Sequence, residues 1–166
     1  MGKEIREKGQ IERLIKNIKP IRMKLEDIPQ VAEIFISYWG TMCLYKNSTF
    51  ERIINQKFSY VYKIKDEVIA LCLMEYNCAK NIMEVVLLCV KKEFKGHHLG
   101  KSLLDFCINY CCEYGYTNFS LHVSTTNNPA FNLYAKLGFK IKEFFESYYS
   151  DEKPEDSDAY YMELNL

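Results

Sequence analysis

An apolar stretch followed by a glycine-bearing basic loop is the feature that most constrains how this chain can fold. Residues 82–90 are apolar except for Glu84 and include several β-branched valines. This composition predicts a strand buried on both faces of a sheet. A polar turn then passes through residues 91–101 into residues 102–114, where apolar residues recur at helical spacing. The sequence therefore predicts a strand, a basic loop and a helix in succession.

The loop between this strand and this helix has the chemistry of an anion-binding site. The first N–H groups of a helix have no partner within the helix, and the helix dipole makes that end partly positive. An anion placed there is stabilised by both effects. Gly96 and Gly100 let the backbone approach a ligand closely, and Lys95 and Lys101 add positive charge. Because the glycine spacing fits neither a dinucleotide fingerprint nor a P-loop, we predict a phosphate cradle of another kind.

The composition of the chain narrows the classes of function. A chain of 166 residues with 48% hydrophobic residues is long enough for one domain with a proper core. Its net charge of +0 argues against a general nucleic-acid or membrane-surface binder. No apolar run approaches the roughly 18 residues that a membrane span needs, and the N-terminus has no apolar signal-peptide region. We therefore expect no nucleic-acid partner and no membrane partner.

The cysteines indicate a reducing compartment. The chain has 7 cysteines, and Cys72, Cys89, Cys107 and Cys111 lie within apolar strand or helix patterns. Such cysteines are typical of small core residues rather than of a disulfide framework. No C-x-x-C pair occurs, and the histidines are not at zinc spacing from any cysteine pair. The sequence thus predicts a cytoplasmic protein without a metal site.

The rest of the chain alternates between strand and helix patterns. Residues 1–19 are expected to form a basic extension, and residues 20–166 the domain. Asp27 is expected to cap a first helix, Ser48 a second short helix, and Asn127 or Asn128 a last helix that ends at Gly138. The remaining strands are expected at residues 21–25, 60–64, 68–76, 118–123, 139–149 and 159–166, the last two around an acidic loop.

Two motifs of this chain resemble the signatures of the GNAT acetyltransferase superfamily. The loop resembles the [RQ]-x-x-G-x-[GA] acetyl-CoA signature, with Lys95 in place of Arg or Gln, Gly100 as the last glycine, and His98 where a middle glycine is usual. The second motif resembles N-x-x-A-x-x-[LF]-Y-x-[KR]-x-G-F. It matches at Asn127, Ala130, Leu133, Tyr134, Lys136, Gly138 and Phe139. Together the two signatures cover about residues 82–140.

The resemblance implies a fold and a cofactor. The fold is the α/β GNAT fold, a mixed and mostly antiparallel sheet of about seven strands, splayed between the fourth and fifth strands and flanked by about four helices. The cofactor is acetyl-CoA, with pantetheine in the gap between the splayed strands. The residues implied to bind it are Leu88, Cys89, Val90, Lys95, Gly96, His97, His98, Leu99, Gly100, Lys101, Asn127 and Tyr134.

Three residues are candidates for the chemistry of acetyl transfer to an amine. Glu84 interrupts an apolar strand, where a carboxylate is costly unless it faces a wet cleft, so it is a candidate general base. His122 stands where the Nα-acetyltransferases of the family use a histidine base through water, and an imidazole suits this task. Tyr134 matches the tyrosine that many members place near the CoA sulfur as general acid. The alternatives are a solvated strand-end glutamate, a strand-edge histidine and a core tyrosine.

Residues near the end of the chain indicate which kind of amine accepts the acetyl group. Tyr148-Tyr149 followed by Asp158-Ala159-x-x-Met162 resembles the end of protein Nα-acetyltransferases, including ribosomal-protein alanine acetyltransferases. This resemblance implies transfer to the α-amino group of a peptide or protein. The residues expected at the acceptor are Tyr38, Trp39, Tyr148 and Tyr149.

Two other functions remain open at the level of the sequence. One is acetylation of a small amine such as glucosamine 6-phosphate, and the other is a non-catalytic GNAT-fold module that binds CoA. The sequence leaves open whether the protein is a monomer or a homodimer.

Overall fold

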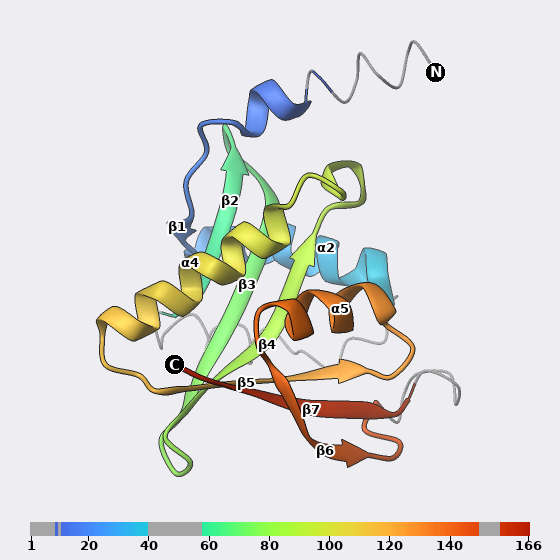
Figure 1. Ribbon diagram of the computed structural model, residues 1–166. Helices are drawn as coiled ribbons and strands as arrows, with labels where there is room; N and C mark the ends of the chain where they lie inside the picture. The colour runs from blue at the N-terminus through green and yellow to red at the C-terminus, as the bar shows by residue number, and fades with distance from the viewer. Residues whose placement is uncertain (1–8, 10, 40–57, 150–156) are drawn as a thin grey trace. The chain divides into compact units, whose positions relative to one another are not determined.

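The described part of the protein forms a seven-stranded sheet with helices. The computed structural model describes residues 9, 11–39, 58–149 and 157–166. The strands are β1 (Ile21–Arg22), β2 (Tyr60–Ile64), β3 (Glu67–Asn77), β4 (Ile82–Val90), β5 (Asn118–Ser124), β6 (Lys140–Phe145) and β7 (Ala159–Asn165). The helices are α2 (Ile28–Trp39), α4 (Leu99–Glu113) and α5 (Asn128–Lys136), with 3-10 turns η1 (Leu25–Asp27) and η2 (Lys92–Phe94) (Figure 1).

The sheet is mixed, as the sequence predicts. The strand order is β1-β2-β3-β4-β5-β7-β6. The β1–β2, β2–β3, β5–β7 and β6–β7 pairs are antiparallel, and β4 pairs with β5 in parallel. The β4–β5 register runs from Met83–Phe119 to Val85–Leu121, whereas β4 continues to Val90 and β5 to Ser124. The expected α/β fold is confirmed, and the pairing of its fourth and fifth strands is short.

The chain packs as two compact units. The first unit comprises residues 1–73 and 87–107, and the second comprises residues 74–86 and 108–166. The chain passes between the units within β3, β4 and α4, so each of these elements contributes residues to both.

The first unit buries an apolar core. β3 is buried from Val68 to Leu73, which is the pattern of a strand covered on both faces. The helices contribute buried residues at helical spacing: Val31, Ile34 and Phe35 from α2, and Leu103, Leu104 and Cys107 from α4.

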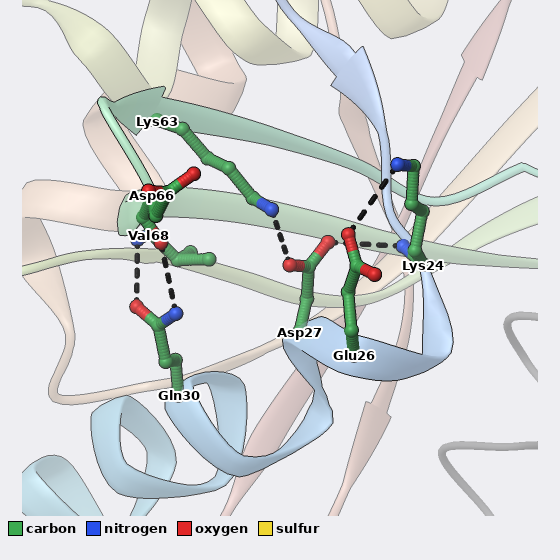
Figure 2. A network of polar contacts seen from close by, with 7 residues as sticks. All are labelled: Lys24, Glu26, Asp27, Gln30, Lys63, Asp66 and Val68. Carbon is green, nitrogen blue, oxygen red and sulfur yellow. Dashed lines mark hydrogen bonds and ion pairs between the residues drawn. The ribbon is translucent and has the colours of Figure 1, made fainter.

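A buried polar network in the first unit ties α2 to the β2–β3 hairpin (Figure 2). Asp27 is 1% exposed; its carboxylate accepts a hydrogen bond from the Lys24 amide at 3.0 Å and forms an ion pair with Lys63. Gln30 accepts from the Val68 amide and donates to the Asp66 carbonyl, both at 2.9 Å. Asp27 directly precedes α2, where a capping residue is predicted, and its carboxylate also reaches back to Lys24 and across to the hairpin.

The second unit has its core on one face of β5 and β7. Phe119, Leu121, Val123 and Met162 are buried, with exposures of 4% or less. Helix α5 adds Tyr134 to this core, and its Phe131 ring lies 5.8 Å from the ring of Tyr160 on β7. Because side chains alternate along a strand, the opposite face of β5 and β7 carries Ser120, His122, Tyr161 and Glu163.

Several predicted boundaries and burials differ from the structure. β4 is not buried on both faces: its odd-numbered residues from 83 to 89 are buried and its even-numbered residues are half-buried. The first strand is only two residues long, because η1 begins at Leu25. The strand expected over 139–149 ends at Phe145, so Tyr148 and Tyr149 lie in a turn. Helix α4 begins at Leu99, three positions before the predicted start.

Some predictions fall on other parts of the chain. Residues 11–15 of the predicted extension form a short helix. The second short helix at 48–55, the loop at 41–47 and most of the acidic loop lie outside the described residues. None of the helices in the described part is long and apolar enough to cross a membrane.

Candidate active site

Glu84 and His122 meet on one face of the sheet in the second unit. Glu84 on β4 is the register partner of Ser120 on β5, and His122 lies two residues further along β5, on the same face as Ser120. Glu84 Oε1 lies 3.2 Å from His122 Nδ1. The side chains are 32% and 16% exposed, respectively, so the pair is half-buried but reaches solvent. The two candidate bases therefore form one hydrogen-bonded pair.

Three aromatic rings surround the imidazole of His122. The Tyr148 ring is stacked on it, with a centroid distance of 4.2 Å and an interplanar angle of 11°. The Tyr161 ring lies at 5.0 Å in a tilted arrangement, and the Phe145 ring lies at 5.7 Å and meets it edge-on. Of the four acceptor residues predicted, the structure thus brings Tyr148 to the Glu84–His122 pair.

A small pocket opens beside the pair. Its volume is about 70 Å³, which is room for a few water molecules. The residues that line it are mostly polar: Asn77, Lys80, Ile82, Glu84, Ser120, His122, Glu143, Phe145 and Tyr161. A carboxylate on β4 that reaches this pocket keeps contact with water, which is the condition expected for Glu84 in an apolar strand.

Tyr161 also lines this pocket, although no motif in the sequence pointed to it. It is the register partner of both His122 and Glu143, and its hydroxyl donates to Glu163 Oε1 at 2.9 Å. Lys80 Nζ lies 5.9 Å from its ring centroid. The alternation of Ser120 with His122, and of Tyr161 with Glu163, was visible in the sequence. However, the register that places Tyr161 opposite His122 depends on how β5 and β7 pair, which no local pattern shows.

Both tyrosines beside His122 stay protonated at neutral pH. Burial, and then the negative charge of Glu84, raise the pKa of Tyr148. Burial is also the largest cause that raises the pKa of Tyr161, and the hydrogen bond to Glu163 adds to it. These phenols can therefore donate hydrogen bonds but do not serve as bases near neutral pH.

Tyr134 and Asn127 lie on α5 of the second unit. Tyr134 is 7% exposed, and its ring centroid is 5.8 Å from that of Phe139. Asn127 is the N-cap of α5, where its side chain accepts a hydrogen bond from the Ala130 amide at 3.2 Å. Gly138 follows the helix with φ of +95°, as predicted for a C′ glycine.

The loop predicted to be a phosphate cradle lies in the first unit, between η2 and α4. Gly96 has φ of +79°, and a Cβ added at this position would have no neighbouring heavy atom within 4 Å. His98 has φ of +60°, so the backbone takes the left-handed conformation at the position where the family signature usually has glycine. Helix α4 then begins at Leu99, which directs its first amides toward the loop. His98 thus takes a backbone conformation that favours glycine, and a helix starts directly after it.

Tyr38 belongs to the surroundings of this cradle. Its hydroxyl donates to the Val90 carbonyl at 2.6 Å, and Lys95 Nζ lies 4.5 Å from its ring centroid. Trp39 is the last residue of α2, and its side chain is outside the described residues. Lys101 forms an ion pair with Asp105 at 2.6 Å, whereas Lys95, like Lys92 at 5.6 Å, lies over the Tyr38 ring.

The residues predicted to bind the pantetheine arm alternate along β4. Leu88 and Val90 are half-buried, whereas Cys89 points the other way and is 5% exposed. Burial raises the pKa of Cys89 to about 12, so its thiol is protonated at neutral pH and is not a nucleophile. The open glycine, the helix start and the lysine near it fit a diphosphate group, with Leu88 and Val90 available to an extended apolar arm.

A model of the acetyltransferase (GNAT) family matches residues 28–139, which span both sequence motifs and the Glu84–His122 pair. The chain belongs to the GNAT acetyltransferase family. As a GNAT enzyme it is an N-acetyltransferase that uses acetyl-CoA.

Relatives of this GNAT chain include protein acetyltransferases. It is 26% identical over 133 residues to a putative ribosomal-protein bS18-alanine N-acetyltransferase of Bacillus subtilis, covering 78% of this chain and 85% of the relative. It is 35% identical over 83 residues to an N-alpha-acetyltransferase of Sulfurisphaera tokodaii, covering 49% of this chain and 47% of the relative. Its fold matches Arabidopsis thaliana Naa50, solved with the bisubstrate analogue CoA-Ac-MVNAL, with a TM-score of 0.74 at 20% identity, covering 90% and 99% of the two chains.

Proposed function

We propose that this enzyme acetylates the α-amino group of a peptide or protein N-terminus in the cytoplasm. The observation that carries the proposal is the hydrogen-bonded Glu84–His122 pair beside a small, mostly polar pocket. Two curated relatives named for protein or Nα-acetyltransfer support the class of acceptor. The free cysteines among the described residues fit a reducing compartment.

The geometry supports different roles for the two members of the pair. An ionised carboxylate only accepts hydrogen bonds, so a His122 tautomer protonated at Nδ1 donates to Glu84. That tautomer leaves the lone pair of Nε2 available. We therefore assign His122 Nε2 as the base that takes the proton of the amine, directly or through water, and Glu84 as the carboxylate that orients the imidazole and stabilises its charged form.

The strength of such a base favours an α-amine over a lysine side chain. An α-amino group has a pKa near 7.8, so about a third of it is neutral at pH 7.5. A lysine side chain has a pKa near 10.4, so only about 0.1% is neutral at the same pH. An imidazole base can therefore readily take the proton of an α-amine. Deprotonating a lysine side chain costs much more free energy, because its pKa lies further above that of an imidazole.

The remaining roles follow the family resemblance. Acetyl-CoA supplies the acetyl group as an activated thioester. We assign residues 95–101 and the half-buried face of β4 at Leu88 and Val90 to its binding, and the Tyr134 hydroxyl to the final proton donation. For Asn127 we retain a contact with the cofactor as a prediction beside its observed role as helix cap.

A panel of acceptors tests the proposed function. The protein is incubated with acetyl-CoA and peptides that have free N-termini, and release of free thiol is followed. Peptides with a blocked N-terminus and an internal lysine are the matched control, and glucosamine 6-phosphate represents small amines. We expect turnover only with free α-amines. Turnover only with the sugar phosphate, or CoA binding without turnover of any amine, would overturn the proposal.

Two substitutions test the division of roles. His122→Ala is expected to lower kcat about a hundredfold, the usual scale of general-base catalysis. Glu84→Gln keeps an oxygen that accepts from Nδ1 but removes the charge. It is expected to lower kcat about tenfold and to move the ascending limb of the pH profile, which reports loss of the proton from the base, to lower pH. Glu143→Gln changes another carboxylate of the pocket and serves as the control. A loss in Glu84→Gln equal to that in His122→Ala, with no shift of the profile, would make Glu84 the base.

A further inference from the structure

The turn that follows β6 holds an unfavourable backbone conformation. Ser147 has φ of +51°, although it is not glycine. A left-handed residue with a side chain costs about 1 kcal/mol or more, so it persists only where neighbouring contacts hold it. The turn extends from Glu146 to Tyr149 and lies between the end of β6 and the start of β7.

Two hydrogen bonds from residues just before β7 hold this turn. The Ser147 amide donates to Asp158 Oδ1 at 2.9 Å, and the Tyr149 amide donates to the Ser157 carbonyl at 2.8 Å. The bonds flank Tyr148 on both sides in the sequence. The Ser157 bond involves backbone only, whereas the Asp158 bond depends on one side chain.

Tyr148, between these two amides, is the residue that stacks on His122. Its ring lies 4.2 Å from the imidazole and nearly parallel to it. The other groups around His122 come from paired strands: Glu84 from β4, Phe145 from β6 and Tyr161 from β7. Tyr148 is the group whose position depends on a strained turn.

We propose that Asp158 is a positioning residue for the acetyltransfer reaction. By accepting the Ser147 amide it keeps the turn in the left-handed conformation that stacks Tyr148 on His122. The stacked ring restricts rotation of the imidazole and thereby fixes the direction of Nε2 toward the amine. The inference rests on the proposed role of His122 and gives a physical function to the Asp-Ala motif near the end of the chain.

The alternative is that Asp158 only stabilises the fold. A ring current distinguishes the two roles, because protons of an imidazole stacked under a phenol ring resonate upfield of their usual position. This NMR shift reports the stack directly and needs no substrate, so it remains informative even if the proposed acceptor is wrong.

Asp158→Ala is the primary test in the full-length protein. We expect the upfield shift of the His122 ring protons to be lost and kcat to fall about tenfold, within the range that misplacement of a reacting group produces. Asp158→Asn keeps an oxygen for the Ser147 amide and is expected to restore most of both readouts. Glu146→Ala removes an exposed carboxylate from the same turn and should leave both unchanged.

Two further variants keep the inference falsifiable if Asp158→Ala folds poorly. Tyr148→Leu leaves the turn intact and removes the ring, and it should reproduce the loss of the shift and of kcat. Ser147→Gly in the Asp158→Ala background removes the backbone strain and should recover part of both. The inference is wrong if folded Asp158→Ala keeps the upfield shift, or keeps the wild-type kcat after losing it. It is also wrong if Tyr148→Leu keeps the wild-type kcat, or if Ser147→Gly in the Asp158→Ala background recovers neither readout.

Discussion

At the scale of single residues, two carboxylates of this enzyme are held in largely apolar surroundings. Glu84 lies in a strand of valines and leucines, but it reaches a small, mostly polar pocket and the imidazole of His122. Asp27 is more completely buried and is matched by a lysine and a backbone amide. In both cases a charge inside the fold is stable because a specific partner is present.

Asp27→Ala should destabilise the protein by about 3 kcal/mol, because Lys63 would keep its charge with no carboxylate and the Lys24 amide would lose its acceptor (Figure 2). Asp27→Asn retains an acceptor for the amide and should cost roughly half as much. Urea unfolding measures both.

The control for Asp27 lies next to it. Glu26 pairs with Lys24 on the surface, where both side chains are about two-thirds exposed (66% and 67%). Glu26→Ala should therefore change the free energy of unfolding by less than about 0.5 kcal/mol. Equal effects of the Glu26 and Asp27 substitutions would contradict the importance of the buried network.

At the scale of elements, α5 begins and ends by local rules. Asn127 caps it, Pro129 lies in its first turn, and Gly138 follows it with a positive φ. The same short segment carries Tyr134, a residue of the second family motif, which is buried in the core.

Asn127→Ala should lower the free energy of unfolding by about 1 kcal/mol, because the Ala130 amide loses its acceptor. Asn127→Ser and Asn127→Asp can still cap the helix and should recover most of that loss. Thermal unfolding without any ligand measures the cap, and calorimetry with CoA measures the predicted cofactor contact separately. If Asn127→Ala unfolds like the wild type, the capping bond contributes nothing to stability.

At the scale of the whole molecule, folding protects most of the described cysteines. Cys72, Cys89, Cys107 and Cys111 are buried, while Cys78 and Cys112 are exposed. Burial raises the pKa of Cys89 to about 12, and a hydrogen bond with Cys72 together with burial raises that of Cys107. The native state therefore keeps thiol protons that the unfolded chain releases near pH 9.

This difference predicts a loss of stability in alkali. Because the native pKa is raised, Cys89 contributes its stabilisation fully below about pH 9 and loses it as the pH rises toward 12. At pH 10 the loss from this thiol is about 1 kcal/mol. Unfolding in urea from pH 8 to pH 10.5 should show a shallower pH dependence in Cys89→Ala than in the wild type. Cys78→Ala is the exposed control, and identical slopes in all three proteins would contradict the prediction.

Local patterns in the sequence were sufficient to predict much of this protein. The apolar run at 82–90, the glycines of the basic loop and the cap residues of α5 act over short distances, so they predict β4, the cradle and α5 without knowledge of the fold. The two motifs likewise predicted the family. The exact ends of elements were less well predicted, because η1 depends on the contact of Asp27 with the hairpin.

Only the tertiary structure decided how the site is assembled. The register of β4, β5 and β7 brings Glu84, His122 and Tyr161 to one face, and no local pattern encodes register between strands far apart in the sequence. The stacking of Tyr148 depends on the bond between Ser147 and Asp158, eleven positions apart. The sequence determined which residues could act as acids, as bases or as positive charges for an anion. Pairing and turn geometry, which arise from long-range contacts, decided which of them meet.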